Sequence, residues 1–214
     1  MRISKLEPSQ RVKGRWLVWL DDGSLLRVSE NEVVSFALYA GMELTDDSFD
    51  SLTAAAGVSA VRSKALDLIS ARPLSRRELI QKLTAQPRDR EKQPLATPEQ
   101  AEEAADWLER LGYLNDAEYA KTVARHYSAK GYGDRKVRDE LFRRGVPRAL
   151  WEAALEEAQS PEDGVDTFLH SRLKGSTPDA RELKRVSDAL ARRGYRWDEI
   201  KEGLRRYGAE IEEE

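Results

Sequence analysis

The stretches LFRRGV (residues 141–146) and LARRGY (residues 190–195) are nearly identical and lie 49 positions apart. Each contains an apolar residue, two adjacent arginines and a glycine. Glycine commonly follows the last turn of a helix, because it adopts the left-handed conformation there at little cost. Each stretch therefore predicts the end of a helix, and the repetition predicts a repeated structural unit.

The sequence around the two stretches divides into sets of three predicted helices in the same order. The later sets are 117–130, 134–144 and 147–158, then 164–173, 178–193 and 197–207. An earlier set has a helix from about residue 58, one at 75–84 and one beginning at Pro98. The proposed buried positions of the three middle helices are Leu79 and Leu83, Val137 and Leu141, and Val186 and Leu190. The intervals are 58 and 49, and the extra length falls in the proline-rich loop 87–98, as expected of three tandem units.

The first 50 residues have a different pattern. Residues 3–7 alternate as a half-buried strand does, and RWLVWL (15–20) is followed by a turn at Asp22-Gly23 and by SLLRV (24–28). Ser29 and Glu32 form a capping box that predicts a helix through residue 38, and GMELT (41–45) allows one more short strand. We interpret Trp16 as a packing residue of this small sheet, and Trp19 likewise.

These patterns predict a mainly α protein of tandem three-helix repeats with a small N-terminal sheet plus helix. The small residues TAAAG (53–57) and a shift in composition indicate a linker at 51–60. The predicted parts are a β-rich accessory domain at 1–57, three-helix repeats at 58–116 and 117–159, and a third repeat with an acidic tail at 160–214.

Composition narrows the function. The chain has 214 residues, a net charge of −3 and no cysteine, so any attraction to nucleic acid has to come from a local surface. Without cysteine there is no disulfide framework, and without a signal peptide or an apolar span we expect a cytoplasmic protein with no membrane partner.

Motifs for catalysis and cofactors are missing from the sequence. The two histidines, His126 and His170, have no partners at metal-ligand spacing, and no phosphate-binding glycine loop is present. We therefore expect no enzyme activity, no cofactor and no metal.

Basic residues of the repeated helices are the candidate binding residues. A rotation of 100° per residue places Arg144 and Arg193 near the buried side and a matched set on the outer side. The predicted site consists of Arg77, Arg135, Lys136 and Arg143, the matching Lys184, Arg185 and Arg192, and the nearby Arg125 and Tyr132. Outward cations at fixed spacing suit a polyanion or an acidic protein groove.

Three segments resemble one family. ALDLISARPLSRRELIQKL (65–83), ERLGYLNDAEYA (109–120) and GYGDRKVRDELFRRGVP (131–147) resemble the RecX family of RecA regulators, and the N-terminal segment resembles the leader of its longer members. The resemblance implies a curved array of three repeats that lodges in the groove of the RecA–DNA filament. It implies a monomeric, non-enzymatic protein that inhibits recombinase, ATPase and coprotease activities in recombination and the DNA-damage response, and binds DNA weakly alone.

Two alternatives remain open from the residues themselves. One is a general DNA-binding helical protein, which should present base-reading side chains on a recognition helix. The other is a helical scaffold that binds only proteins. Binding to bare DNA, to RecA alone and to the RecA–DNA filament distinguishes all three.

Overall fold

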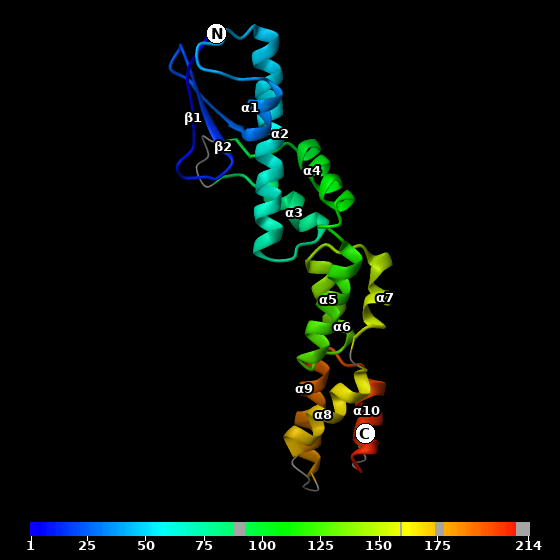
Figure 1. Ribbon diagram of the computed structural model, residues 1–214. Helices are drawn as coiled ribbons and strands as arrows, with labels where there is room; N and C mark the ends of the chain where they lie inside the picture. The colour runs from blue at the N-terminus through cyan, green and yellow to red at the C-terminus, as the bar shows by residue number, and fades with distance from the viewer. Residues whose placement is uncertain (88–92, 159, 174–177, 209–214) are drawn as a thin grey trace. The chain divides into compact units, whose positions relative to one another are not determined.

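The computed structural model describes residues 1–87, 93–158, 160–173 and 178–208 (Figure 1). These residues are mainly helical, with one three-stranded sheet, as predicted. The chain forms two compact units. The first comprises Met1–Arg72 with Leu79–Tyr113, and the second Pro73–Glu78 with Leu114–Glu214.

An antiparallel sheet opens the first unit. Its strands are β1 (Ile3–Pro8), β2 (Arg15–Leu20) and β3 (Leu25–Ser29), in that spatial order. Alternation within β2 directs Trp16, Val18 and Leu20 to one face of the sheet, where Trp16 packs against the core, as predicted. The predicted additional strand at 41–45 is a single bridge between Arg2 and Glu43.

Helix α1 (Glu30–Ser35) is held by the predicted capping residues. The Ser29 amide donates to the Glu32 carboxylate at 2.7 Å, and the Ser59 hydroxyl donates to the same carboxylate at 2.6 Å. The helix is shorter than predicted, because the chain turns at Ala37, whose φ is +48°. Glu32 thus both caps α1 and ties it to the next helix.

Helix α2 (Asp46–Ala71) runs without interruption through the predicted linker, so the linker at 51–60 is wrong. Leu52 and Ala56 pack against the sheet, and Val61 and Ala65 are buried further along, where α2 contacts α4 (Figure 1). Alanine is the best helix former, so three successive alanines extend a helix that has buried contacts on both sides. The predicted boundary after residue 57 falls inside this helix, while the boundaries after 116 and 159 stay predictions.

Two further helices complete the first repeat. They are α3 (Arg76–Leu83) and α4 (Pro98–Arg110). Leu79 and Leu83 are buried, as predicted. Thr97 caps α4 by accepting from the Gln100 amide at 3.3 Å.

The second unit contains the other two repeats. One consists of α5 (Asp116–Ala129), α6 (Asp134–Arg143), the short η1 (Arg148–Leu150) and α7 (Trp151–Leu155). The other consists of α8 (Pro161–Leu173), α9 (Ala180–Arg192) and α10 (Trp197–Arg206). Each repeat surrounds its own apolar cluster. The predicted core positions of both middle helices are buried: Val137, Leu141, Val186 and Leu190.

The continuity of α2 can be tested at its glycine. Gly57 lies in the helix interior, and a β-carbon there would meet no atom within 4 Å. Gly57→Ala should therefore raise the free energy of unfolding by about 0.5–1 kcal/mol, measured by urea denaturation. Gly145→Ala is the opposite control and should lower it, since Gly145 has a φ of +70° and a crowded environment. Unchanged stability of Gly57→Ala would contradict a helical residue 57.

Candidate nucleic-acid interface

Helices α6 and α9 end in the same way. After the last turn, the chain passes through a glycine in the left-handed region, with φ values of +70° and +94°. The following amide then returns to the helix: Val146 donates to the Leu141 carbonyl at 3.0 Å, and Tyr195 donates to the Leu190 carbonyl at 3.3 Å. This closing bond explains the repeated leucine, glycine and apolar residue of the two stretches.

The end of α9 meets the start of α6. The Gly133 amide donates to the Arg193 carbonyl at 3.0 Å, and the Arg135 amide donates to the Gly194 carbonyl at 3.2 Å. A β-carbon on Gly194 would lie 2.6 Å from the backbone nitrogen of Lys136, which excludes any side chain at position 194. The free amides at the start of one helix thereby satisfy free carbonyls at the end of another.

The end of α6 contacts the first turn of α3, here through a side-chain hydrogen bond. The Ser75 hydroxyl donates to the Arg144 carbonyl, and a β-carbon on Gly145 would lie 2.8 Å from the Arg77 β-carbon. The repeated RRG segment therefore has two structural roles: it terminates a helix, and it docks that end onto the middle helix of the preceding repeat.

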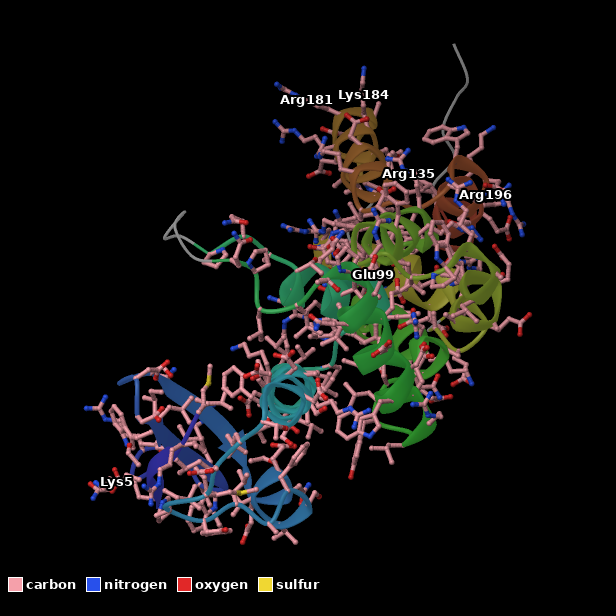
Figure 2. All side chains as sticks on the ribbon, turned by 90° about the horizontal axis from the view of Figure 1, so that it is seen from above. Lys5, Glu99, Arg135, Arg181, Lys184 and Arg196 are labelled. Carbon is pink, nitrogen blue, oxygen red and sulfur yellow. The ribbon has the colours of Figure 1, made fainter. Side chains whose placement is uncertain are left out.

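The middle helices also carry the basic side chains that are candidates for binding. We name the set the basic row: Arg77, Arg135, Lys136, Arg143, Arg181, Lys184, Arg185 and Arg192. The Arg135 guanidinium links the residues of the basic row on α6 to those on α9, because it donates to the Ala191 carbonyl at 3.4 Å. Figure 2 shows Arg181 and Lys184 projecting outward from α9.

Within α6, one buried carboxylate pairs with two residues of the basic row. The Glu140 side chain is only 3% exposed and pairs with Arg143, Arg144 and, at 3.5 Å, with Lys136. Burial by itself would raise the pKa of Glu140, but hydrogen bonds from Arg144 and then Arg143 outweigh it and lower the pKa to about 2. Lys136 and Arg143 face outward as predicted, yet their charges are partly balanced.

Helix α9 has no such carboxylate. Ala189 occupies the place 49 residues after Glu140. Arg181, Lys184, Arg185 and Arg192 are exposed, and in the described part of the chain no carboxylate lies within ion-pair distance of them. The third repeat therefore presents the stronger positive surface.

The second arginine of each RRG segment is directed inward, as predicted. Arg144 donates to the Glu140 carbonyl at 3.3 Å and to the Tyr127 hydroxyl at 3.3 Å. Arg193 donates instead to the carbonyls of Lys130 and Gly131, at 3.2 and 3.0 Å. Arg144 therefore bonds α6 to α5 within one repeat, whereas Arg193 bonds the end of α5 in the neighbouring repeat.

Two predicted site residues are not brought into the basic row. Arg125 lies on α5 and pairs with Glu157 at 3.2 Å. Tyr132 is half-buried, 5.8 Å from the Tyr127 ring and beneath the Arg193 guanidinium at 5.6 Å. Their part in binding stays a prediction, and their contacts indicate structural roles.

The sequence reasoning missed Glu140 and Arg181. Glu140 lies three residues after Val137 and four before Arg144. This spacing predicts both that Glu140 lies near the buried face of the helix and that it can pair with Arg144. Arg181 lies four residues before Arg185 and continues the same face of α9.

Within the described ranges, no cluster of three acidic or histidine side chains is suited to a metal ion. No helix there is long and apolar enough to cross a bilayer.

The sequence is similar to those of known proteins. Residues 115–155 match the model of the second three-helix domain of RecX. A regulatory protein RecX of Pseudomonas fluorescens is 34% identical over 143 residues, covering 66% of this chain and 87% of that protein. One of Trichlorobacter lovleyi is 38% identical over 114 residues, covering 49% and 72%.

Solved structures agree on the fold. A crystal structure of regulatory protein RecX matches 96% of this chain and 98% of its own, with a TM-score of 0.65 and 22% identity. RecX from Lactobacillus salivarius matches 71% and 97%, with a TM-score of 0.61 and 19% identity. The fold and the relatives define a class of helical-repeat regulatory proteins. Within that class, the chain belongs to the RecX family.

Glu140 makes stability depend on pH. Its pKa falls from 4.5 to about 2 on folding, so its stabilisation is complete above pH 4.5 and is lost as the pH falls towards 2. Glu140→Gln should lower the free energy of unfolding by roughly 3 kcal/mol at pH 7.

Urea denaturation of both proteins measures this difference, which should shrink by about 2 kcal/mol at pH 3. Glu156→Gln, at an exposed position after α7, is the control and should match the wild type at both pH values. A difference independent of pH would mean that the ionised carboxylate is not what stabilises α6.

Proposed function

We propose that this protein binds the RecA–DNA filament through the basic row and thereby restrains the recombinase, ATPase and coprotease activities of RecA. Membership of the RecX family and the motifs that resemble RecA regulators support this reading. The observation that carries it is the exposed positive surface of α9, which is extended by Arg135 of α6.

The spacing of this surface suits an extended anion. Arg181, Arg185 and Arg192 recur at intervals of four and seven residues, so they share one face of α9, opposite the buried Val186 and Leu190. Asp188 lies on the same face and reduces the net charge without pairing closely. A stripe of this kind contacts successive phosphates, or the acidic wall of a groove, without reading bases.

The balance of charge favours the third repeat as the main contact. In α6, Glu140 already neutralises Lys136 and Arg143 in part, so a partner gains less there. In α9 the cations have no such competitor in the described structure.

A general sequence-reading DNA-binding protein fits less well. Neither α6 (DRKVRDELFR) nor α9 (ARELKRVSDALAR) contains the asparagine or glutamine that pairs with adenine edges. Lysine and arginine on the outer face favour backbone contacts, which carry little sequence information.

The test is the triple reversal Lys184→Glu, Arg185→Glu and Arg192→Glu. The fold should persist, since exposed substitutions usually change stability by less than about 0.5 kcal/mol each. Binding to the RecA–DNA filament should be lost, and inhibition of ATP hydrolysis and strand exchange with it. The matched control is Arg148→Glu, Arg196→Glu and Arg205→Glu, which changes the charge equally at exposed positions of the same unit.

Salt dependence separates phosphate contacts from protein contacts. If Arg185 contacts a single-stranded DNA phosphate, the slope of log affinity against log salt should be about 0.7 shallower in the single variant Arg185→Ala, which still binds, than in the wild type. Equal binding of bare DNA and of the filament would favour the general DNA-binding alternative. A folded triple reversal that inhibits as well as the wild type would exclude the basic row.

A further inference from the structure

A cavity of about 390 Å³ lies between the end of α5 and one face of α8, within the second unit. The α8 wall is formed by residues spaced three and four apart, the spacing of one helix face. Its lining includes Lys130, Thr167, Phe168, Ser171, Arg172 and Arg193. Neither the basic row nor the proposed function uses this cavity.

The charge of the cavity is one-sided. Lys130, Arg172 and Arg193 supply three cations, and no carboxylate is among the lining residues. The described residues also provide no ion-pair partner to any of the three. Such an arrangement leaves the positive charge of the lining uncompensated.

The two arginines converge on one ring. The Arg193 guanidinium lies 4.7 Å from the centre of the Phe168 ring, and the Arg172 guanidinium lies 5.5 Å from it. The face of an aromatic ring attracts a cation. Phe168 therefore holds two cationic side chains at the lining, where no carboxylate balances their charge.

The remaining donors fit an oxyanion. Arg193 uses Nη1 for the carbonyls of Lys130 and Gly131, and a guanidinium has five N–H donors in all. Ser171 directs its hydroxyl proton to the Phe168 carbonyl, whereas Thr167 places a second hydroxyl on the same wall. Arginine, lysine and threonine are the side chains that commonly bind phosphate oxygens.

We propose that this cavity is a phosphate-binding site in which Arg172, Arg193 and Lys130 hold the charge and Thr167 contributes a hydroxyl. The phosphate comes either from a small molecule, such as inorganic phosphate, or from a nucleic-acid backbone. The inference does not rest on RecA as partner, because none of its residues belongs to the basic row.

The first experiment titrates the full-length protein with inorganic phosphate against chloride at constant ionic strength. Two-dimensional amide NMR spectra should show saturable shifts at Gly131, Thr167 and Ser171. Arg172→Ala should weaken this binding about tenfold, the loss expected from one charge-assisted contact. Arg172 is the residue to change, because Arg193 also bonds two helix-end carbonyls.

Arg148→Ala is the matched control. Its guanidinium also stacks on an aromatic ring, at 5.8 Å from that of Trp151, but it does not line the cavity. It should bind phosphate as the wild type does. Shifts that do not saturate, or equal affinity for Arg172→Ala and the wild type, would overturn the proposal.

A second titration, with a thymidine oligonucleotide, identifies the source of the phosphate. If Arg172→Ala weakens the binding of both inorganic phosphate and the oligonucleotide, the cavity binds backbone phosphate. If it weakens inorganic phosphate alone, the site serves a small phosphate compound. Because RecA is absent from both titrations, their outcome is independent of whether the filament is the partner.

Discussion

The docking of one helix end onto the next helix start is the constraint on which the second unit depends. Where α9 meets α6, backbone amides and carbonyls bond directly across the junction, and the Gly194 backbone approaches Lys136 too closely for any side chain. A helix end buried without partners would leave polar groups unsatisfied at a cost of about 1–3 kcal/mol each. At the end of α6 a side chain serves the same purpose, because the Ser75 hydroxyl donates to the Arg144 carbonyl. Gly194 and Arg193 are therefore constrained by the contact between the second and third repeats, before any partner is considered.

Two repeats with the same backbone plan carry different electrostatics. The two helices differ at one matched position, which is Glu140 in α6 and Ala189 in α9. The carboxylate of Glu140 forms ion pairs with neighbouring cations of α6, and alanine cannot do so in α9. In α6 the carboxylate ties Arg143 and Arg144 to the helix and adds stability. In α9 the corresponding arginines have no such partner. Arg193 bonds a carbonyl at the end of α5, and Arg192 is exposed. Repetition of a fold thus does not imply repetition of a surface, and the repeats can divide structural and binding roles.

The parts of this structure that follow from local sequence were predictable. Strand β2 has the predicted bounds, and α6 differs from its prediction by one residue, because a turn signal or a glycine marks each end. The direction of Arg144 and Arg193 followed from helical rotation alone. What failed depends on contacts distant in sequence. Residues 53–57 suit a linker or a helix equally well, and burial against the sheet and α4 decides between them. Likewise, the partner of Arg125 lies 32 residues away, where no spacing rule reaches.

The uninterrupted α2 also limits how the length of this chain can change in evolution. Leu52 and Ala56 contact the sheet, and Val61 and Ala65 are buried where α2 meets α4, so the helix holds the two contact sets at one relative rotation. One inserted residue between them would turn one set by about 100° and displace it by about 1.5 Å. A gain or loss of about seven residues, near two full turns, would bring the two sets back to within about 20° of their relative rotation. The turn between β1 and β2 carries no such requirement and can absorb a single codon inserted or deleted.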